Sequence, residues 1–140
     1  MSVDDEAGWR KLWAGYLEFY KNSDLPEAVT ANSFNRFLDN DDWFAFVAVE
    51  DTQLVGFVHA LLHPSTWSEN DVCYLEDLFV AQSVRGGGVG RALIEKVFEE
   101  ARSRNCHRVY WITEESNKQA RILYDDLATL TGFVHYRREL

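Results

Sequence analysis

The sequence has little of what several large classes of protein require. Its two cysteines, Cys73 and Cys106, are too few for a disulfide framework. Each falls in or beside an expected buried strand, so we expect reduced thiols and a cytoplasmic location. No apolar run approaches the roughly twenty residues of a membrane span, and no signal peptide opens the chain. Without repeats, linkers or low-complexity tracts, the 140 residues predict a single domain, 1–140.

Basic residues are scarce and unevenly placed. The net charge is −9, with 15 acidic and 4 basic residues in 1–77 against 8 and 10 in 78–140. A nucleic-acid-binding protein needs a basic face, so the composition argues against that class. His59 and His63 lie on an expected strand or at its end without cysteine partners, which gives little support for a metal site. Acidic surfaces commonly serve solubility, but the concentration of acidity in one half favours a further cause.

Glycine is concentrated in residues 80–93, VAQSVRGGGVGRAL. The apolar run 74–80 predicts a buried strand before this stretch, and apolar residues at helical spacing predict a helix over 89–104. Four of the five residues 86–90 are glycine, which suits a sharp turn and a close backbone approach. The N-terminus of the following helix offers unpaired N–H groups, so we interpret the stretch as a phosphate site rather than a flexible turn.

The details of the glycine loop narrow the kind of phosphate site. A Walker loop needs a Gly-Lys-Ser/Thr ending, which is absent, and the spacing does not fit the G-x-G-x-x-G dinucleotide fingerprint. The pattern Arg85-x-x-Gly88-x-Gly90 instead resembles the acetyl-CoA pyrophosphate loop of the GNAT superfamily of N-acetyltransferases. That family's second segment, N-x-x-A-x-x-L-Y, is similar to Asn117, Ala120, Leu123 and Tyr124. YLEDLFV and RVYW most resemble the subgroup of histone/polyamine and spermidine/spermine acetyltransferases.

The remaining elements follow from periodicity and turn signals. A first helix with a cap at Asp4 or Asp5 carries an aromatic face, and a second helix starts at Pro26. Segments 43–49 and 54–62 predict a hairpin, 63–70 a loop, 108–112 a short strand and 133–137 a closing strand. Ser116 or Asn117 caps a last helix that Gly132 ends.

The resemblance implies a mixed α/β (α+β) GNAT fold. Such a fold has a central, mostly antiparallel sheet, splayed between its fourth and fifth strands and flanked by about four helices. Residues 1–3 leave almost no room for the family's first strand, so we expect it to be reduced or missing. The neighbouring edge would then need a cover, and we expect a homodimer built partly on the last strands.

Acetyl transfer from a thioester to an amine needs a base, a stabilised oxyanion and an acid for the leaving thiolate. Glu76 matches the glutamate that acts through water in spermidine/spermine-type enzymes. The alternative is a strand-edge carboxylate with a structural role, and period-two alternation would turn its neighbour Asp77 to the opposite face. Tyr124 matches the family tyrosine that protonates the thiolate, although a packed core tyrosine has the same spacing.

The resemblance also implies the coenzyme-binding residues. Backbone N–H groups near Phe79 and Val80 would hold the pantetheine and polarise the thioester, and Arg85, Arg91, Lys118 and Arg121 would reach the phosphates. The expected set is Leu78, Phe79, Val80, Arg85, Gly86, Gly87, Gly88, Val89, Gly90, Arg91, Asn117, Ala120 and Tyr124. No metal belongs to this chemistry.

We therefore expect an acyltransferase that uses acetyl-CoA as cosubstrate to acetylate a primary amine by direct transfer. The acceptor would be a small molecule or a peptide amine, and neither nucleic acid nor membrane is expected as a partner. The acidic first half would supply the acceptor side, which predicts a cationic acceptor, a polyamine or a lysine side chain. Alternatives are a non-catalytic acyl-CoA-binding or sensing domain, a nucleotide-binding module, or an enzyme for amino acids or xenobiotic amines.

Overall fold

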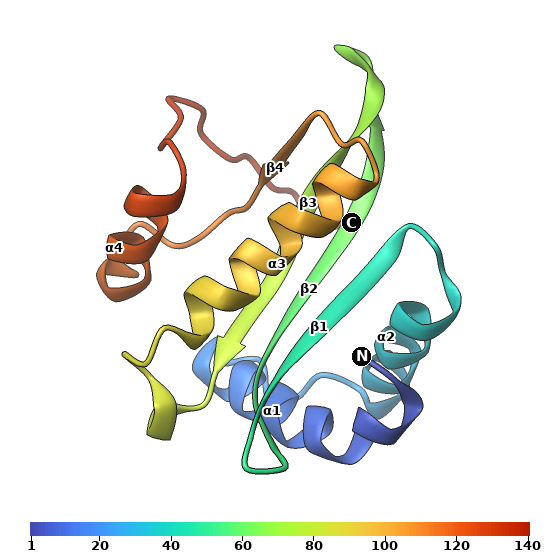
Figure 1. Cartoon of the computed structure of the whole chain (residues 1–140), viewed down its shortest axis with the longest axis vertical. Helices are drawn as coiled ribbons and strands as arrows, with labels where there is room; N and C mark the ends of the chain where they lie inside the picture. The colour runs from blue at the N-terminus through green and yellow to red at the C-terminus, as the bar shows by residue number, and fades with distance from the viewer.

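The computed structural model describes residues 1–140 and shows one central sheet between helices (Figure 1). The sheet order is β1-β2-β3-β4. Helices α1 and α2 cover one face, while α3 and α4 lie on the other. The elements are α1 Glu6–Phe19, α2 Glu27–Asp39, β1 Trp43–Glu50, β2 Gln53–Ser65, β3 Ser68–Val80, α3 Val89–Ser103, β4 Arg108–Tyr110 and α4 Lys118–Leu127, with short 3₁₀ turns at Val3–Asp5 and Gln82–Val84. None of the helices is both long and apolar enough to span a membrane.

The chain enters the fold through helices. No strand precedes α1, as predicted, and the N-terminal amine instead donates to the Ala45 carbonyl in β1 at 3.1 Å. Asp5 precedes α1, but its carboxylate accepts from the Ser2 backbone N–H at 2.6 Å rather than capping the helix. Pro26 stands immediately before α2, where its missing N–H costs nothing.

The apolar faces build two cores, one on each side of the sheet. Beneath α1 and α2 the buried side chains are Trp9, Leu12, Trp13, Leu17, Phe34 and Phe57. Beneath α3 they include Val58, Leu75, Ile94 and Val97. The helical periodicity of the sequence therefore predicted the buried faces of α1 and α3.

Strands β2 and β3 are longer than expected, and the predicted loop 63–70 is wrong. Ser65 pairs with Ser68, so only a two-residue turn, 66–67, joins them. Pro64 suggested a break, yet it lies at a skip in the register between His63 and Ser65. A proline is tolerated there because no ladder N–H is required of it.

The sheet opens between β3 and β4. The two strands pair in parallel only over Val72–Tyr74 and Arg108–Tyr110, and β3 then continues to Val80 without that neighbour. The other pairings are antiparallel, which gives the predicted mixed, splayed sheet. The opening exposes one backbone edge of β3 next to the glycine loop.

The C-terminal end differs from the prediction. Helix α4 ends at Leu127 rather than near Gly132, because Ala128 takes an extended conformation. No strand forms over 133–137. A strand makes its backbone hydrogen bonds only with a neighbouring edge, and none pairs with this segment within the chain.

Candidate active site

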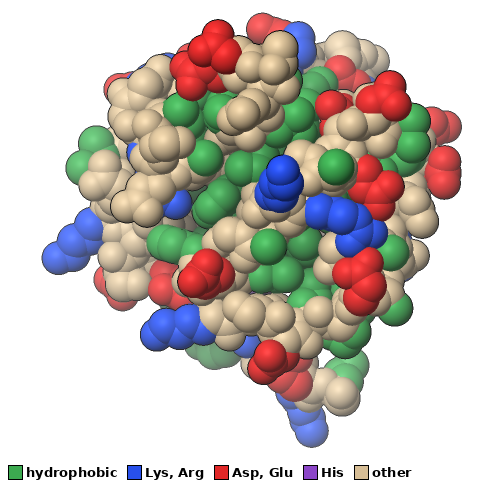
Figure 2. Space-filling view, turned by 90° about the horizontal axis from the view of Figure 1, so that it is seen from below, with side chains coloured by type: hydrophobic (Ala, Val, Ile, Leu, Met, Phe, Trp, Pro, Cys, Tyr) green, Lys and Arg blue, Asp and Glu red, His purple; other side chains and the backbone are tan.

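A cavity of about 910 Å³ lies where the sheet opens. It is bounded by the end of β3, the glycine loop, α4 and the last turn of α1. Figure 2 views this end of the molecule and shows apolar side chains in a hollow beside Lys and Arg side chains. Apart from Gly87, Lys118 and Arg121, the coenzyme-binding residues expected from the sequence all line this cavity, namely Leu78, Phe79, Val80, Arg85, Gly86, Gly88, Val89, Gly90, Arg91, Asn117, Ala120 and Tyr124.

The glycine loop presents a row of unpaired donors to the cavity. Gly86 and Gly88 both have φ of +86°, a left-handed conformation that side-chain-bearing residues rarely adopt. The first hydrogen bond closing α3 runs from Ala92 N–H to the Gly88 carbonyl at 3.0 Å. The N–H groups of residues 86 and 88–91 consequently donate to nothing in the chain. Five such donors at a helix N-terminus fit a pyrophosphate.

Two arginines, Arg85 and Arg91, lie beside these donors and differ in whether a carboxylate pairs with them. Arg91 forms an ion pair with Asp126 in α4, and that hydrogen bond raises the pKa of Arg91. Arg85 has no carboxylate partner: its Nε donates to the Val80 carbonyl at 3.0 Å, and its guanidinium lies 5.7 Å from the Phe79 ring centroid. Arg85 is therefore the cation left available for a ligand.

The other two expected cations lie elsewhere. Lys118 lines a smaller neighbouring cavity, and Arg121 lines neither. The Arg121 guanidinium instead donates to the Glu115 carbonyl at 3.0 Å. Arg121 thus stabilises the loop before α4 in this structure.

The open edge of β3 faces the same cavity. Ala81 N–H donates to the Val55 carbonyl at 2.8 Å, and the Phe79 carbonyl lies close to Gly56 of β2. Because backbone groups alternate along an antiparallel strand, those of Leu78 and Val80 point away from β2. The N–H groups free for a ligand are those of Leu78 and Val80, and the expectation for Phe79 is corrected.

Tyr124 lies on α4 with its ring against Trp111, the centroids 5.4 Å apart. Burial, with a smaller effect from Tyr20, raises the pKa of Tyr124 to about 12. The Tyr124 hydroxyl makes no hydrogen bond within the chain. Because every buried side-chain nitrogen or oxygen atom has a hydrogen-bond partner, this unpartnered hydroxyl is accessible to solvent. Asn117 occupies the N-cap position of α4, but its amide donates to Thr113 Oγ1 at 3.0 Å instead of capping the helix.

Glu76 occupies a β-bulge. His59 pairs with Asp77 and Ala60 with Leu75, which leaves Glu76 without a cross-strand partner. The bulge interrupts the simple alternation that would have turned Glu76 away from Asp77. Burial is the largest cause that raises the pKa values of Tyr16 and Tyr74, and the charge of Glu76 adds to it. The Glu76 side chain is exposed and lines neither cavity. Burial, and then Asp77, raise the pKa of Glu76 itself.

Asp77 is held in a buried hydrogen-bond network that sequence reasoning missed. It accepts from the Tyr16 hydroxyl at 2.5 Å and from His59 Nδ1 at 2.8 Å. His59 Nε2 in turn accepts from Trp9 Nε1 at 2.8 Å, which fixes the proton on Nδ1. Burial lowers the pKa of His59, so the ring is neutral. Both ring nitrogens are occupied, and His59 is not available to a metal.

A second cavity of about 260 Å³ adjoins the first. The two share Phe19, Tyr20, Asn117 and Gln119, and the smaller one adds Glu114, Ser116 and Lys118. Tyr16 and Tyr20, on the aromatic face expected for the first helix, and Glu114 were not among the predicted site residues. The spacing of Tyr16 and Tyr20, four residues apart on one face of α1, was the available signal.

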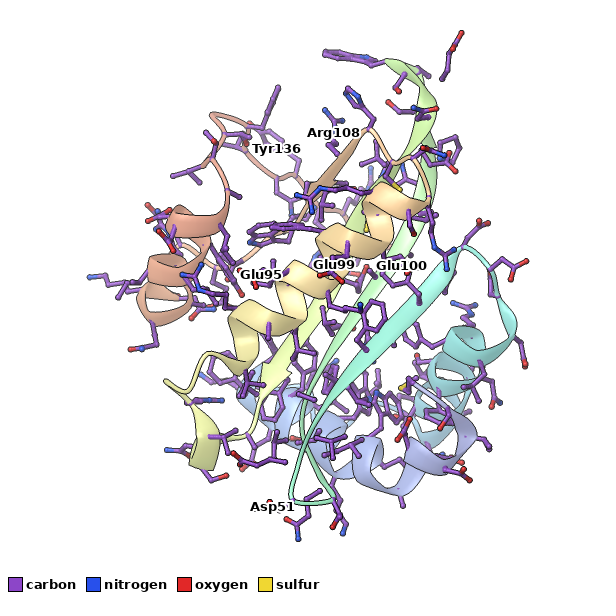
Figure 3. The ribbon with its side chains drawn as sticks, in the orientation of Figure 1. Asp51, Glu95, Glu99, Glu100, Arg108 and Tyr136 are labelled. Atoms are coloured by element: carbon purple, nitrogen blue, oxygen red, sulfur yellow. The ribbon has the colours of Figure 1, made fainter.

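The acidic residues of the first half do not converge on these cavities. None of Asp24, Glu27, Asp41, Asp42, Glu50, Asp51, Glu69 and Asp71 lines either one. Glu27 is paired with Arg10 at 2.7 Å, and Asp51 projects from the β1–β2 turn (Figure 3). The expected acidic cleft is therefore corrected: the carboxylates that line the two cavities are Glu114 and Asp126, and Asp126 is paired with Arg91.

Comparison with known proteins identifies the family. Residues 9–128 match the Acetyltransferase (GNAT) family. The chain is 39% identical over 137 residues to D-amino-acid N-acetyltransferase HPA3 of Saccharomyces cerevisiae, covering 96% of this chain and 84% of the relative. It is 36% identical over 80 residues to mouse thialysine N-epsilon-acetyltransferase, covering 54% and 46%. Aminoglycoside acetyltransferase AAC(6')-Iy in complex with a bisubstrate analog has the same fold, with a TM-score of 0.84, 21% identity and coverage of 100% and 95%.

The fold, the glycine loop and these matches define an acyltransferase. The chain belongs to the GNAT acetyltransferase family and is an acetyl-CoA-dependent N-acetyltransferase.

Proposed function

We propose that this enzyme acetylates a small cationic primary amine, with the coenzyme pyrophosphate held on the N–H groups of residues 86 and 88–91. The observation that carries the proposal is the row of five unpaired donors opening onto a cavity that reaches Tyr124. Arg85 adds a cation at the same place, and the free N–H groups of Leu78 and Val80 supply donors for the pantetheine and the oxyanion.

Three groups then serve the transfer. Glu76 takes the proton that the amine loses as its nitrogen bonds to the thioester carbon, through a water molecule. An N–H at the open edge of β3 stabilises the oxyanion. Tyr124 holds its proton at neutral pH, because its pKa is raised to about 12, and gives it to the sulfur as the C–S bond breaks.

The acceptor enters where the two cavities meet, at Tyr20. The groups around this junction include the carboxylate of Glu114, and behind it Asp77 accepts from the hydroxyl of Tyr16, which lines the larger cavity. Negative charges on this wall attract an ammonium group, and the aromatic rings of Phe19 and Tyr20 can cover its apolar stem. These carboxylates, rather than the general acidity of the first half, support the cationic acceptor.

An amino acid is the second candidate acceptor. The yeast relative is a D-amino-acid N-acetyltransferase, and Lys118 lines the smaller cavity beside Glu114. A cation and an anion in one small cavity suit a zwitterion, which carries both charges. This alternative predicts that removing the charge of Lys118 weakens acceptor binding.

A panel of amines tests the proposal, with free thiol release from acetyl-CoA as the signal. Spermidine, lysine, a lysine-bearing peptide, a D-amino acid and a neutral amine are compared at fixed ionic strength. Highest kcat/KM with a polyamine or lysine supports the cationic acceptor, and highest kcat/KM with the D-amino acid supports the second candidate. Calorimetric binding of coenzyme A without thiol release for any amine would overturn both.

A further inference from the structure

Lys118 differs from the other lysines of the chain because it lines a cavity of the active site. The chain has four lysines, and Lys11, Lys21 and Lys96 line neither the larger nor the smaller cavity. The Lys118 ammonium forms no salt bridge within the chain, whereas Lys96 pairs with Glu99 at 2.7 Å. An exposed, unpaired primary amine therefore lies in the region proposed for the acceptor amine.

The second charged group of the smaller cavity does not hold Lys118 in place. The Glu114 carboxylate accepts instead from Ser116 Oγ at 3.1 Å. Lys118 also bonds to Ser116, but through its backbone N–H, which donates to the Ser116 carbonyl at 2.8 Å. The ammonium is thus carried on a flexible aliphatic stem that no contact of this kind restrains.

Helix α4 sets the direction in which a bound coenzyme extends. Its C-terminal half lies at the glycine loop, because Asp126 pairs with Arg91. Lys118 begins the same helix, about 12 Å from Asp126 along the axis. The larger cavity runs from the glycine loop past Tyr124 to Asn117, where the smaller cavity joins it. A thioester whose pyrophosphate is held at the loop is therefore directed toward the end of α4 that carries Lys118.

We propose that the enzyme acetylates itself at Lys118 when no other amine occupies the acceptor region. This inference rests on the proposed place of the coenzyme. The Lys118 ammonium gives one proton to water, and its nitrogen bonds to the acetyl carbon as the C–S bond breaks. The sulfur takes the proton of Tyr124, which regains one from the nitrogen. The products are an N-acetyllysine and the free thiol of coenzyme A.

Self-acetylation changes the charge of the smaller cavity. Of the residues that line it, only Glu114 and Lys118 are charged. Acetylation removes the positive charge of Lys118 and leaves the negative charge of Glu114. A cavity with both charges suits a zwitterionic amino acid, whereas one with a carboxylate alone suits a cationic amine. The modification therefore shifts the preference of the enzyme from amino acids toward cationic acceptors.

Mass spectrometry of the enzyme incubated with acetyl-CoA alone tests the proposal. Peptide mapping should show acetylation at Lys118 about tenfold or more faster than at Lys21, because an amine held beside the thioester reacts faster than one free in solution. Lys21 is exposed, follows α1 and lines neither cavity. The rate should not depend on enzyme concentration, since amine and thioester belong to one complex. Equal acetylation of all four lysines, or a rate that rises with enzyme concentration, overturns the inference.

Arginine variants provide the matched controls. Lys118→Arg keeps the positive charge but removes the amine, so the acetyl group at this position should be lost. Lys21→Arg makes the same change outside both cavities and should still be acetylated at Lys118. Acetylation that disappears equally from both variants would contradict the assignment of the site.

Lys118→Gln removes the positive charge as acetylation does. Compared with Lys118→Arg, it should raise the ratio of kcat/KM for spermidine to kcat/KM for a D-amino acid about two- to fivefold, the size expected for one exposed charge pair. An equal ratio in the two variants would overturn the change of preference.

Turnover of added amines separates this inference from the proposed function. Thiol release with an added amine, without any acetyl group at Lys118, overturns the self-acetylation and leaves the proposed function standing. Coenzyme A binding without acetyl transfer to any amine or to Lys118 overturns both.

Discussion

Tyr124 meets Trp111 edge to face, with ring centroids 5.4 Å apart, and this contact aims an unpartnered hydroxyl into the cavity between β3 and α4. A buried tyrosine hydroxyl usually finds a hydrogen-bond partner within the protein. This one is available to a ligand, which supports the acid role proposed for it.

Replacing Tyr124 by phenylalanine keeps the ring packing and removes only the proton donor. We expect kcat to fall about 10²- to 10⁴-fold with acetyl-CoA affinity nearly unchanged. Steady-state thiol release and calorimetry measure the two quantities. Tyr110→Phe is the control, because Tyr110 lies outside both cavities and bonds only to His63. Full turnover by the Tyr124 variant would leave that residue with a packing role alone.

Gly88→Ala should weaken coenzyme binding at least tenfold. Gly88 has φ of +86°, and a Cβ there would meet no protein atom within 4 Å, so it would enter the open space where we propose that the pyrophosphate binds. An alanine in this left-handed conformation also costs about 1–2 kcal/mol of backbone strain, and relief of that strain would shift the loop itself. Calorimetry with coenzyme A measures the loss. Gly132→Ala, which has no close neighbour and no positive φ, should bind normally. Equal affinities for the two variants would contradict the assignment of the loop.

Much of this site was predictable because its signals are local. The glycines at 86–90 and the apolar spacing of α3 specify a turn and a helix N-terminus within one short stretch. The same holds for α4, where Ala120 and Tyr124 fall on one face. The predicted residues of these two segments line one cavity, except Gly87, whereas the cap at Asp5 and the helix end at Gly132, which are also local signals, were wrong.

The Asp77 network was not predictable, because it joins residues that are distant in sequence. Tyr16 is 61 positions from Asp77, and Trp9 is 50 from His59. The bulge at Glu76 depends on the register between β2 and β3, which period-two alternation cannot show. The predicted strand at 133–137 is wrong for the same reason, because its composition suits a strand but the segment pairs with no edge of the sheet.

His59 should make the protein less stable as pH falls below about 6.5. Burial lowers the pKa of His59 in the folded state, so the unfolded chain binds a proton that the folded chain does not. Stability is then lost from about pH 6.5 downward, with a slope of at most about 1.4 kcal/mol per pH unit. Urea unfolding between pH 7.5 and 5.5 measures this slope. His59→Gln, which can still bond Trp9 and Asp77, should be less stable but show a shallower slope. An unchanged slope would mean that other groups carry the pH dependence.

A cationic acceptor predicts a dependence on salt. With spermidine, kcat/KM should fall between low salt and about 0.5 M, where the Debye length is only a few Å. Glu114→Gln should reduce both kcat/KM and this salt dependence, because Glu114 lines the acceptor cavity. Glu95→Gln is the control, since Glu95 lies on α3 and lines neither cavity (Figure 3). Equal kcat/KM for spermidine and a D-amino acid, without a salt effect, would mean that the acidic residues serve solubility and do not select the acceptor.

The exposed apolar C-terminal segment predicts a homodimer. Phe133 and Tyr136 are 86% and 89% exposed, and neither forms part of a strand. Large aromatic side chains that are exposed close together are costly in water, and we expect a second copy to offer the strand edge that 133–137 lacks. Light scattering at micromolar concentration should give twice the 16.2 kDa chain mass. Phe133→Asp should shift the mass toward the monomer. Val3→Asp, at a residue 67% exposed at the other end of the chain, should not. A wild-type mass of 16.2 kDa across that concentration range would contradict the dimer.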